Sequence, residues 1–218
     1  MKQNFFFILL ISLLTILPVF PQDADEINNK ASAILLTLAQ DKTTPESEFN
    51  DLKDLFFLNV NEELLQTKYL TNIASFDSLR SHLVEYESEK KGINSDSSLM
   101  LLVDWYLHFQ RTFYNYNRMN FFNSAKVKIL FFTTSVSCPC TMEMCRKQLI
   151  EILKLKNKSK DAYSFFIVDS YWNNDLQIEY ETYFAPSVLI FNGKNELHSL
   201  IEYDEKMPKK LNDTLKKL

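Results

Sequence analysis

The residues of this chain best suited to chemistry are three cysteines, Cys138, Cys140 and Cys145, the only cysteines in the sequence. A cysteine thiolate is a nucleophile, and two thiols can join reversibly as a disulfide. Pro139 separates the first two cysteines, and proline is favoured in the first turn of a helix, where its missing N–H costs no hydrogen bond. We therefore expect Cys138 to be the N-cap of a helix and Cys140 to lie in its first turn.

The start of a helix changes the chemistry of a thiol placed there. Such a thiolate faces unpaired backbone N–H groups and the positive end of the helix dipole, so we expect its pKa to fall below the usual value of about 8.5. A helix rises about 1.5 Å per residue, which places Cys145 roughly 10 Å from Cys138 and more than about 7 Å from Cys140, both beyond the reach of a disulfide. The spacing therefore predicts that only Cys138 and Cys140 can pair, in a small, strained and easily reduced ring.

The segment that must position the cysteines, residues 124–218, alternates strands with helices. Continuous apolar and β-rich runs predict strands buried on both faces, and a turn rich in asparagine and glycine predicts a hairpin. The predicted strands are 127–132, 163–168, 187–191 and 197–203, and the predicted helices are 142–156, 175–183 and 208–218. The resulting order is β-α-β-α-β-β-α, with the cysteines between the first strand and the first helix.

This order resembles the thioredoxin fold. The residues that carry the resemblance are Ser137-Cys138-Pro139-Cys140-Thr141-Met142 after the first strand, Val168-Asp169 after the second, Tyr183, Ala185-Pro186-Ser187, and 189–193. Proteins of this fold hold a proline, commonly cis, directly before a strand, and Pro186 occupies that place. The resemblance implies an α/β thioredoxin-like C-terminal domain over residues 124–218, preceded by an all-α N-terminal region.

The cysteine motif departs from the usual pattern of that family. The family has Cys-x-x-Cys, whereas this chain has Ser137-Cys138-Pro139-Cys140, so Ser137 stands where the attacking cysteine is expected and Cys138 takes the next position. The buried acid of many thioredoxins would align near Phe131. An acid that assists proton transfer is therefore not expected in the first strand.

The resemblance implies a thiol-disulfide oxidoreductase. Cys138 would attack, or accept, a mixed disulfide with a protein substrate, and Cys140 would resolve it. The family role of Ala185 and Pro186 is to hold the substrate strand against the site. Ser137 and Cys145 are auxiliary candidates, and no cofactor and no metal are required.

Residues 23–123 are predicted as a helical domain. Apolar residues recur at helical spacing in the segments 31–39, 52–58, 64–69 and 79–86. A longer helix is predicted at 99–119, where large aromatic side chains share one face: Trp105, Phe109, Phe113 and Tyr116. We expect this stripe to be core, with a groove for a partner as the alternative.

Residues 1–22 are predicted as a signal peptide or as an uncleaved N-terminal anchor. Lys2 precedes an apolar run at 5–17 that Pro18 interrupts, the pattern of an export signal. The run is shorter than the roughly 20 residues of a full membrane span, and its cleavage site is poor. We expect an extracytoplasmic protein, periplasmic or secreted, or one tethered to the inner membrane through residues 5–20. Disulfides persist in those compartments.

Composition narrows the class of function. Apolar residues make up 46% of the 218 residues and charged residues 24%, as in globular proteins with a packed core. The chain has two glycines, Gly92 and Gly193, which excludes the glycine-rich loops that bind phosphates and dinucleotides. A net charge of −4 argues against nucleic acid as a partner. The expected partners are protein thiols or disulfides and a redox partner protein.

Other interpretations stay open at this point. Three close thiols suit Cu(I) or Zn(II), with His198 as the histidine of this half. Alternatively, the helical region is a binding module and the thioredoxin-like half a redox-inactive support with two structural thiols. Cys145 also has a purely structural interpretation, as a small buried apolar residue. An exposed free thiol outside the cytoplasm is open to oxidation, which favours a reactive role for Cys138 and Cys140.

Overall fold

The structure, a computed structural model, describes residues 24–40, 46–57, 62–90 and 95–218. The signal peptide or anchor predicted for residues 1–22 lies outside this part of the chain. Within the described ranges, none of the helices has both the length and the apolar character that a membrane crossing requires.

Four strands form one mixed sheet in the order β2-β1-β3-β4. The central strand β1 (Val127–Thr133) runs parallel to β2 (Tyr163–Asp169) and antiparallel to β3 (Ser187–Phe191). At the edge, β4 (Leu197–Glu202) pairs with β3 as an antiparallel hairpin. Helices α8 (Pro139–Ser159), α9 (Asp175–Glu179) and α10 (Met207–Leu215) connect or follow the strands. The predicted β-α-β-α-β-β-α order is confirmed.

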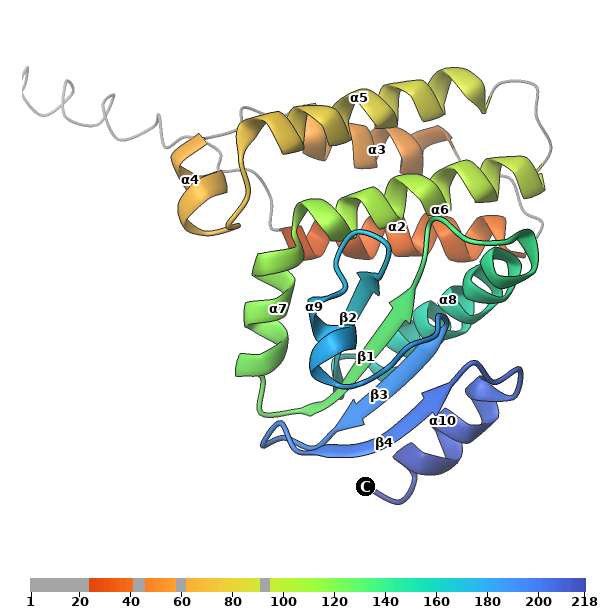
Figure 1. Cartoon of the computed structure of the whole chain (residues 1–218). Helices are drawn as coiled ribbons and strands as arrows, with labels where there is room; N and C mark the ends of the chain where they lie inside the picture. Colours follow the sequence, from red (N-terminus) through yellow and green to blue (C-terminus); the bar gives the residue numbers. More distant parts are fainter. Residues whose placement is uncertain (1–23, 41–45, 58–61, 91–94) are drawn as a thin grey trace, which may run out of the picture.

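Helices cover both faces of the sheet (Figure 1). Because successive side chains of a strand point to opposite faces, Ile129 and Phe131 of β1 pack in the same cluster as α8 and α10. Leu130 and Phe132 instead pack with α9 and with α7 (Tyr114–Asn123). All four of these side chains are fully buried. The prediction of a strand buried on both faces is therefore confirmed for β1.

The N-terminal region is helical, as predicted. It consists of α2 (Ala24–Leu38), α3 (Glu46–Phe57), α4 (Glu62–Thr67), α5 (Ile73–Glu89) and α6 (Ser95–Thr112), which lead into α7. In Figure 1, α2 and α6 lie between the sheet and the pair α3 and α5, and α6 contacts β2 while α2 contacts α8. One continuous apolar cluster joins these helices to the α8 face of the sheet.

The aromatic stripe is core, as expected: Trp105, Phe109, Phe113 and Tyr116 are all buried. The single helix predicted for residues 99–119 is wrong, however, because the chain bends at Phe113. The backbone of Phe113 has φ −103° and ψ 20°, which separates α6 from α7. This bend lets α7 turn onto the sheet, where Tyr114 and Phe121 contact the ring of Phe166. Helical periodicity continues across the bend and therefore did not reveal it.

Some predicted boundaries also differ from those observed. Helix α8 extends beyond the predicted 142–156 at both ends, because Pro139 begins it and the lysine-rich end remains helical. Helix α9 ends at Glu179, before the predicted end at residue 183. Two residues later, the backbone of Glu181 has a φ of 52°, which does not continue an α-helix.

We expect Gly193→Ala to destabilise the protein. Gly193 lies in the turn between β3 and β4, where an added Cβ would collide with the backbone carbonyl oxygen of Ala125. The backbone must shift to relieve this contact, at a cost of about 1–3 kcal/mol of unfolding free energy. Urea unfolding measures the change, with the exposed neighbour Lys194→Ala as the matched control. Equal unfolding midpoints for the two variants would contradict the prediction.

Candidate functional site

Cys138 is the N-cap residue of α8, and Pro139 is the first residue of the helix, as predicted. The backbone of Cys138 is extended, with φ −64° and ψ 152°, and its carbonyl accepts the N–H of Met142 at 3.0 Å. The Sγ atoms of Cys138 and Cys140 lie 2.8 Å apart, and both cysteines are exposed and unbridged. The structure therefore brings two free thiols together at the entrance of a helix.

The environment of Cys138 favours its thiolate. Its pKa is lowered to about 7, first by the contact with the Cys140 thiol and then by the side chain and backbone N–H of Thr141. The Thr141 hydroxyl lies 3.2 Å from the Cys138 Sγ, so it can donate a hydrogen bond to the thiolate. The shift agrees in direction with the one expected for a helix N-terminus.

Cys145 does not join the exposed pair. It lies further along α8 with 2% of its surface exposed, next to Thr133 and Thr134 at the end of β1. Burial raises the pKa of its thiol, so Cys145 is predominantly neutral at neutral pH. It is buried beside the polar groups of Thr133 and Thr134 and is out of reach of the exposed pair.

A groove of about 620 Å³ runs beside the two exposed thiols. Ser137, Thr141 and Ala185 line it, together with exposed aromatic side chains: Tyr183, Phe184 and Tyr203. The peptide bond between Ala185 and Pro186 is cis, and Pro186 itself is buried. Ser137 and Thr141, the neighbours of the two cysteines in the sequence, therefore share one groove with Ala185.

Glu202, at the end of β4, fixes the segment that precedes the cis bond. Its Oε1 atom accepts the backbone N–H groups of Tyr183 at 2.8 Å and Phe184 at 3.1 Å. These bonds hold the aromatic wall of the groove against the sheet. No feature of the sequence had indicated this role for Glu202.

Tyr203 was also missed. Its hydroxyl lies 3.4 Å from Thr141 Oγ1, next to Cys138, and its backbone N–H donates to the carbonyl of Pro186 at 2.9 Å. The predicted hairpin held a signal for this placement. Antiparallel pairing brings the end of the last strand next to the start of the third, where Pro186 stands.

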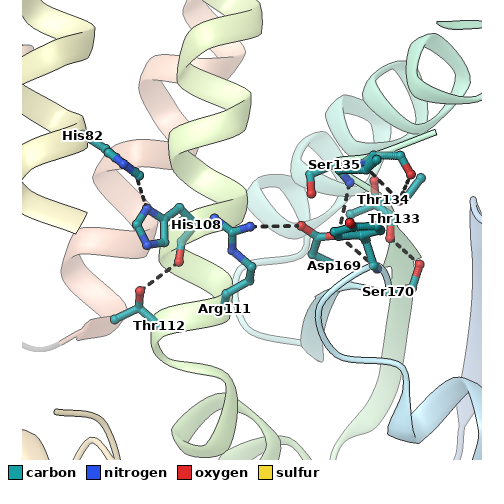
Figure 2. A network of polar contacts seen from close by, with 11 residues as sticks. His82, His108, Arg111, Thr112, Thr133, Thr134, Ser135, Asp169 and Ser170 are labelled. Carbon is teal, nitrogen blue, oxygen red and sulfur yellow. Dashed lines mark hydrogen bonds and ion pairs between the residues drawn. The ribbon is translucent and has the colours of Figure 1, made fainter. Parts of the chain in front are cut away.

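A third missed feature lies beneath the residues that lead to the cysteines. Asp169, the last residue of β2, is fully buried and faces Ser135, while Arg111 of α6 extends toward it from the helical region (Figure 2). His82 of α5 and His108 of α6 form a separate contact between these two helices, with their Nδ1 atoms 2.6 Å apart. The residues of each contact are far apart in the sequence, so the sequence gave no sign of either contact.

The described residues contain no group of three or more His, Cys, Asp and Glu side chains arranged to hold a metal ion. His198, the histidine considered with the thiols, is exposed on β4.

We expect Thr141→Val to slow the alkylation of Cys138 near neutral pH. In the unmodified protein the rate should rise through pH 7 and level off above it, because the Cys138 pKa is about 7 and the thiolate is the reacting form. Loss of the Thr141 hydroxyl raises this pKa, so the rate at pH 7 falls by about threefold while the plateau at high pH is unchanged. Iodoacetamide labelling of the full reduced chain against pH, with the adduct on Cys138 resolved from those on the other cysteines by peptide mass spectrometry, measures both values. An unchanged midpoint in the Thr141→Val variant would contradict the assigned role.

No protein-family model and no curated protein matches this sequence. Solved structures of thioredoxins do match. The thioredoxin of Trypanosoma brucei brucei is 15% identical over 46% of this chain and 80% of its own, with a TM-score of 0.38. Mitochondrial thioredoxin 3 of Saccharomyces cerevisiae, in its oxidised form, is 17% identical over 48% and 89%, with a TM-score of 0.38. The thioredoxin of Fasciola hepatica is 16% identical over 46% and 88%, with a TM-score of 0.37.

The topology of this chain itself settles the fold class. The parallel β1-α8-β2 unit, the antiparallel β3 and β4, the closing α10 and a cis proline before β3 are all present. The cysteine pair lies at the start of α8, the helix that follows β1. Residues 124–218 of this chain therefore have a thioredoxin-like fold, preceded by an N-terminal helical region.

Proposed function

We propose that this chain is a thiol-disulfide oxidoreductase of the cell envelope that exchanges disulfides with protein substrates through Cys138 and Cys140. The observation that carries the proposal is the pair of exposed sulfur atoms, 2.8 Å apart at the start of α8. Two further features support it: the lowered pKa of Cys138 and the adjacent groove. A thiolate that forms at neutral pH, a second thiol within reach and room for a substrate are what thiol-disulfide exchange requires.

In the reducing direction, the Cys138 thiolate attacks one sulfur of a substrate disulfide. That disulfide breaks, its second sulfur leaves and takes up a proton, and Cys138 is joined to the substrate in a mixed disulfide. Cys140 then loses its proton and attacks Cys138 Sγ, which forms the Cys138–Cys140 disulfide and releases the other substrate thiol. Two electrons pass from the pair to the substrate, and the reverse steps oxidise a substrate dithiol.

The groove gives the substrate chain a place beside the reacting sulfurs. Ser137 and Ala185 both line it, and Pro186 stands between Ala185 and the start of β3. We assign Ala185 and Pro186 to substrate holding and Ser137 to an auxiliary contact at the cysteine end. The reaction needs no metal and no organic cofactor.

The proposed location follows from residues 1–22, read as an export signal or an uncleaved anchor. A disulfide exchanged in the envelope escapes the reducing systems of the cytosol. Fractionation of cells that express the tagged full chain tests this part separately. Protein recovered from the cytosol alone would refute the location without affecting the thiol chemistry.

A redox titration tests the activity. The purified full chain is equilibrated across a glutathione redox series, trapped by alkylation and analysed by mass spectrometry. We expect one reversible transition that links Cys138 to Cys140 and leaves Cys145 as a free thiol. The matched control is Cys140→Ser, which should give only mixed disulfides with glutathione. Absence of a Cys138–Cys140 disulfide across the whole series would refute the dithiol mechanism.

A further inference from the structure

Asp169 is a buried carboxylate that holds the residues leading to the cysteines. We refer to residues 134–137 as the cysteine loop. The Oδ1 atom of Asp169 accepts the backbone N–H of Ser135 at 3.1 Å, in the cysteine loop, and the backbone N–H of Tyr171 at 3.3 Å. Asp169 also lies opposite Thr133 in the parallel pairing of β1 and β2. One side chain therefore ties the end of β2 to the segment that presents Cys138.

The charge partner of this carboxylate comes from the N-terminal helical region. The guanidinium of Arg111, near the end of α6, lies 3.9 Å from Asp169 Oδ2, as Figure 2 shows. Arg111 is itself held in place, because its guanidinium stacks over the ring of Trp172 at 5.0 Å. The contact thus connects a helix outside the thioredoxin-like half to the cysteine loop.

The burial of Asp169 makes this ion pair necessary. The side chain has no exposed surface, and its Oδ2 atom has no hydrogen-bond donor among the described residues. A buried charge without a partner is strongly unfavourable. Without Arg111, the buried carboxylate must admit water or turn toward solvent, and either change weakens its bond to Ser135.

The rest of the loop transmits such a change to Cys138. Thr134 and Val136 bond to each other across the loop, with Thr134 Oγ1 donating to the Val136 carbonyl at 2.9 Å. Ser170 fixes Thr133, the residue directly before the loop, because the N–H and the hydroxyl of Ser170 both donate to the Thr133 carbonyl at 2.8 Å. Because the loop is a short compact unit anchored at Thr133 and Ser135, a displaced Ser135 moves Cys138 relative to Cys140.

We propose that Arg111, acting through Asp169, is a positioning residue of the dithiol site, so that the helical region helps to hold Cys138 against Cys140. This inference rests on the proposed function, because it concerns the formation of the Cys138–Cys140 disulfide. Two thiols that are already held together form a disulfide more readily than two that must be ordered first. The ion pair therefore favours the disulfide form of the pair.

The test is a double-mutant cycle with Arg111→Gln, Asp169→Asn and the double variant, each titrated as the full chain in glutathione. Arg111→Gln leaves an unpaired buried carboxylate, and we expect the equilibrium constant for the Cys138–Cys140 disulfide to fall by about tenfold. Asp169→Asn keeps an oxygen that accepts the Ser135 N–H, so we expect a change below about threefold. The double variant removes the unpaired charge and should return to the value of Asp169→Asn.

Two controls separate positioning from general damage. Arg118→Gln, on α7, removes an arginine that pairs with Asp175 and Glu179 at the surface, and it should leave the equilibrium unchanged. Arg111→Lys keeps a cation and should retain most of the wild-type equilibrium constant for the Cys138–Cys140 disulfide. This variant also tests the positioning role if Arg111→Gln does not fold. Thermal unfolding of every variant shows whether stability and redox equilibrium change together.

The outcomes separate this inference from the proposed function. If the wild type forms the disulfide but Arg111→Gln behaves like Arg118→Gln, the positioning role is refuted and the oxidoreductase proposal stands. A double variant as impaired as Arg111→Gln would refute the action through Asp169. If the wild type forms no Cys138–Cys140 disulfide, the proposed function fails and this inference fails with it.

Discussion

Replacing Cys138 by serine should lower the rate of disulfide exchange by at least about a thousandfold, because a hydroxyl is a far weaker nucleophile than a thiolate at neutral pH. Cys138 is exposed, its pKa is lowered to about 7, and it is the N-cap of α8. Reduction of a small aromatic disulfide, followed by the absorbance of the released thiol, measures the rate. The full chain with all other residues intact is the reference.

Serine variants of the two remaining cysteines make the same change in the side chain and therefore serve as matched controls. Cys140→Ser keeps the attacking thiolate but lacks the resolving one, so we expect the first exchange to persist and a mixed disulfide on Cys138 to accumulate. Cys145→Ser should leave the exchange rate within about twofold, because Cys145 is buried and its pKa is raised. Exchange that survives in Cys138→Ser and is lost in Cys140→Ser would reverse the two roles.

The sheet and the position of the cysteines could be predicted because local signals determine them. The apolar run that forms β1 needs burial on both faces whatever packs on it, and Pro139 favours a helix start through its own geometry. The contact between Cys138 and Cys140 follows from the same local rules, since two residues at one helix entrance have little freedom to separate. Each of these features depends on neighbours in the sequence.

The features that were missed depend on residues distant in the sequence. Arg111 on α6 and Asp169 on β2 meet only because α6 packs along β2. No spacing rule relates their positions. The bend at Phe113 is of the same kind, because it is stabilised by the packing of α7 on the sheet and the periodicity of the helix does not encode it. Phe131 stands where the resemblance places a buried acid, and the neighbouring strand carries the buried acid Asp169 at its end.

Phe109 gives the largest expected effect on stability and shows whether the two regions fold together. Its ring is buried in α6 and contacts four other aromatic rings, those of Phe56, Trp105, Tyr106 and Phe113. Truncation of a large aromatic core residue to alanine leaves a cavity and costs about 3–5 kcal/mol of unfolding free energy. We therefore expect Phe109→Ala to unfold at a much lower urea concentration. The exposed Met100→Ala on the same helix should change stability by less than about 0.5 kcal/mol.

Two probes then report on the two regions within one unfolding experiment. In a Trp172→Phe background, Trp105 fluorescence follows the helical region, and alkylation of the buried Cys145 follows the thioredoxin-like half. One apolar cluster includes both Phe109 of α6 and Leu149 of α8, so we expect both probes to shift together in Phe109→Ala, as in a cooperative unit. Separate transitions, with only the Trp105 signal displaced, would instead support the division into domains at 23–123 and 124–218. Separate transitions would also mean that Arg111 constrains the cysteine loop less, because a contact between independently folding parts is held less firmly than a contact within a shared core.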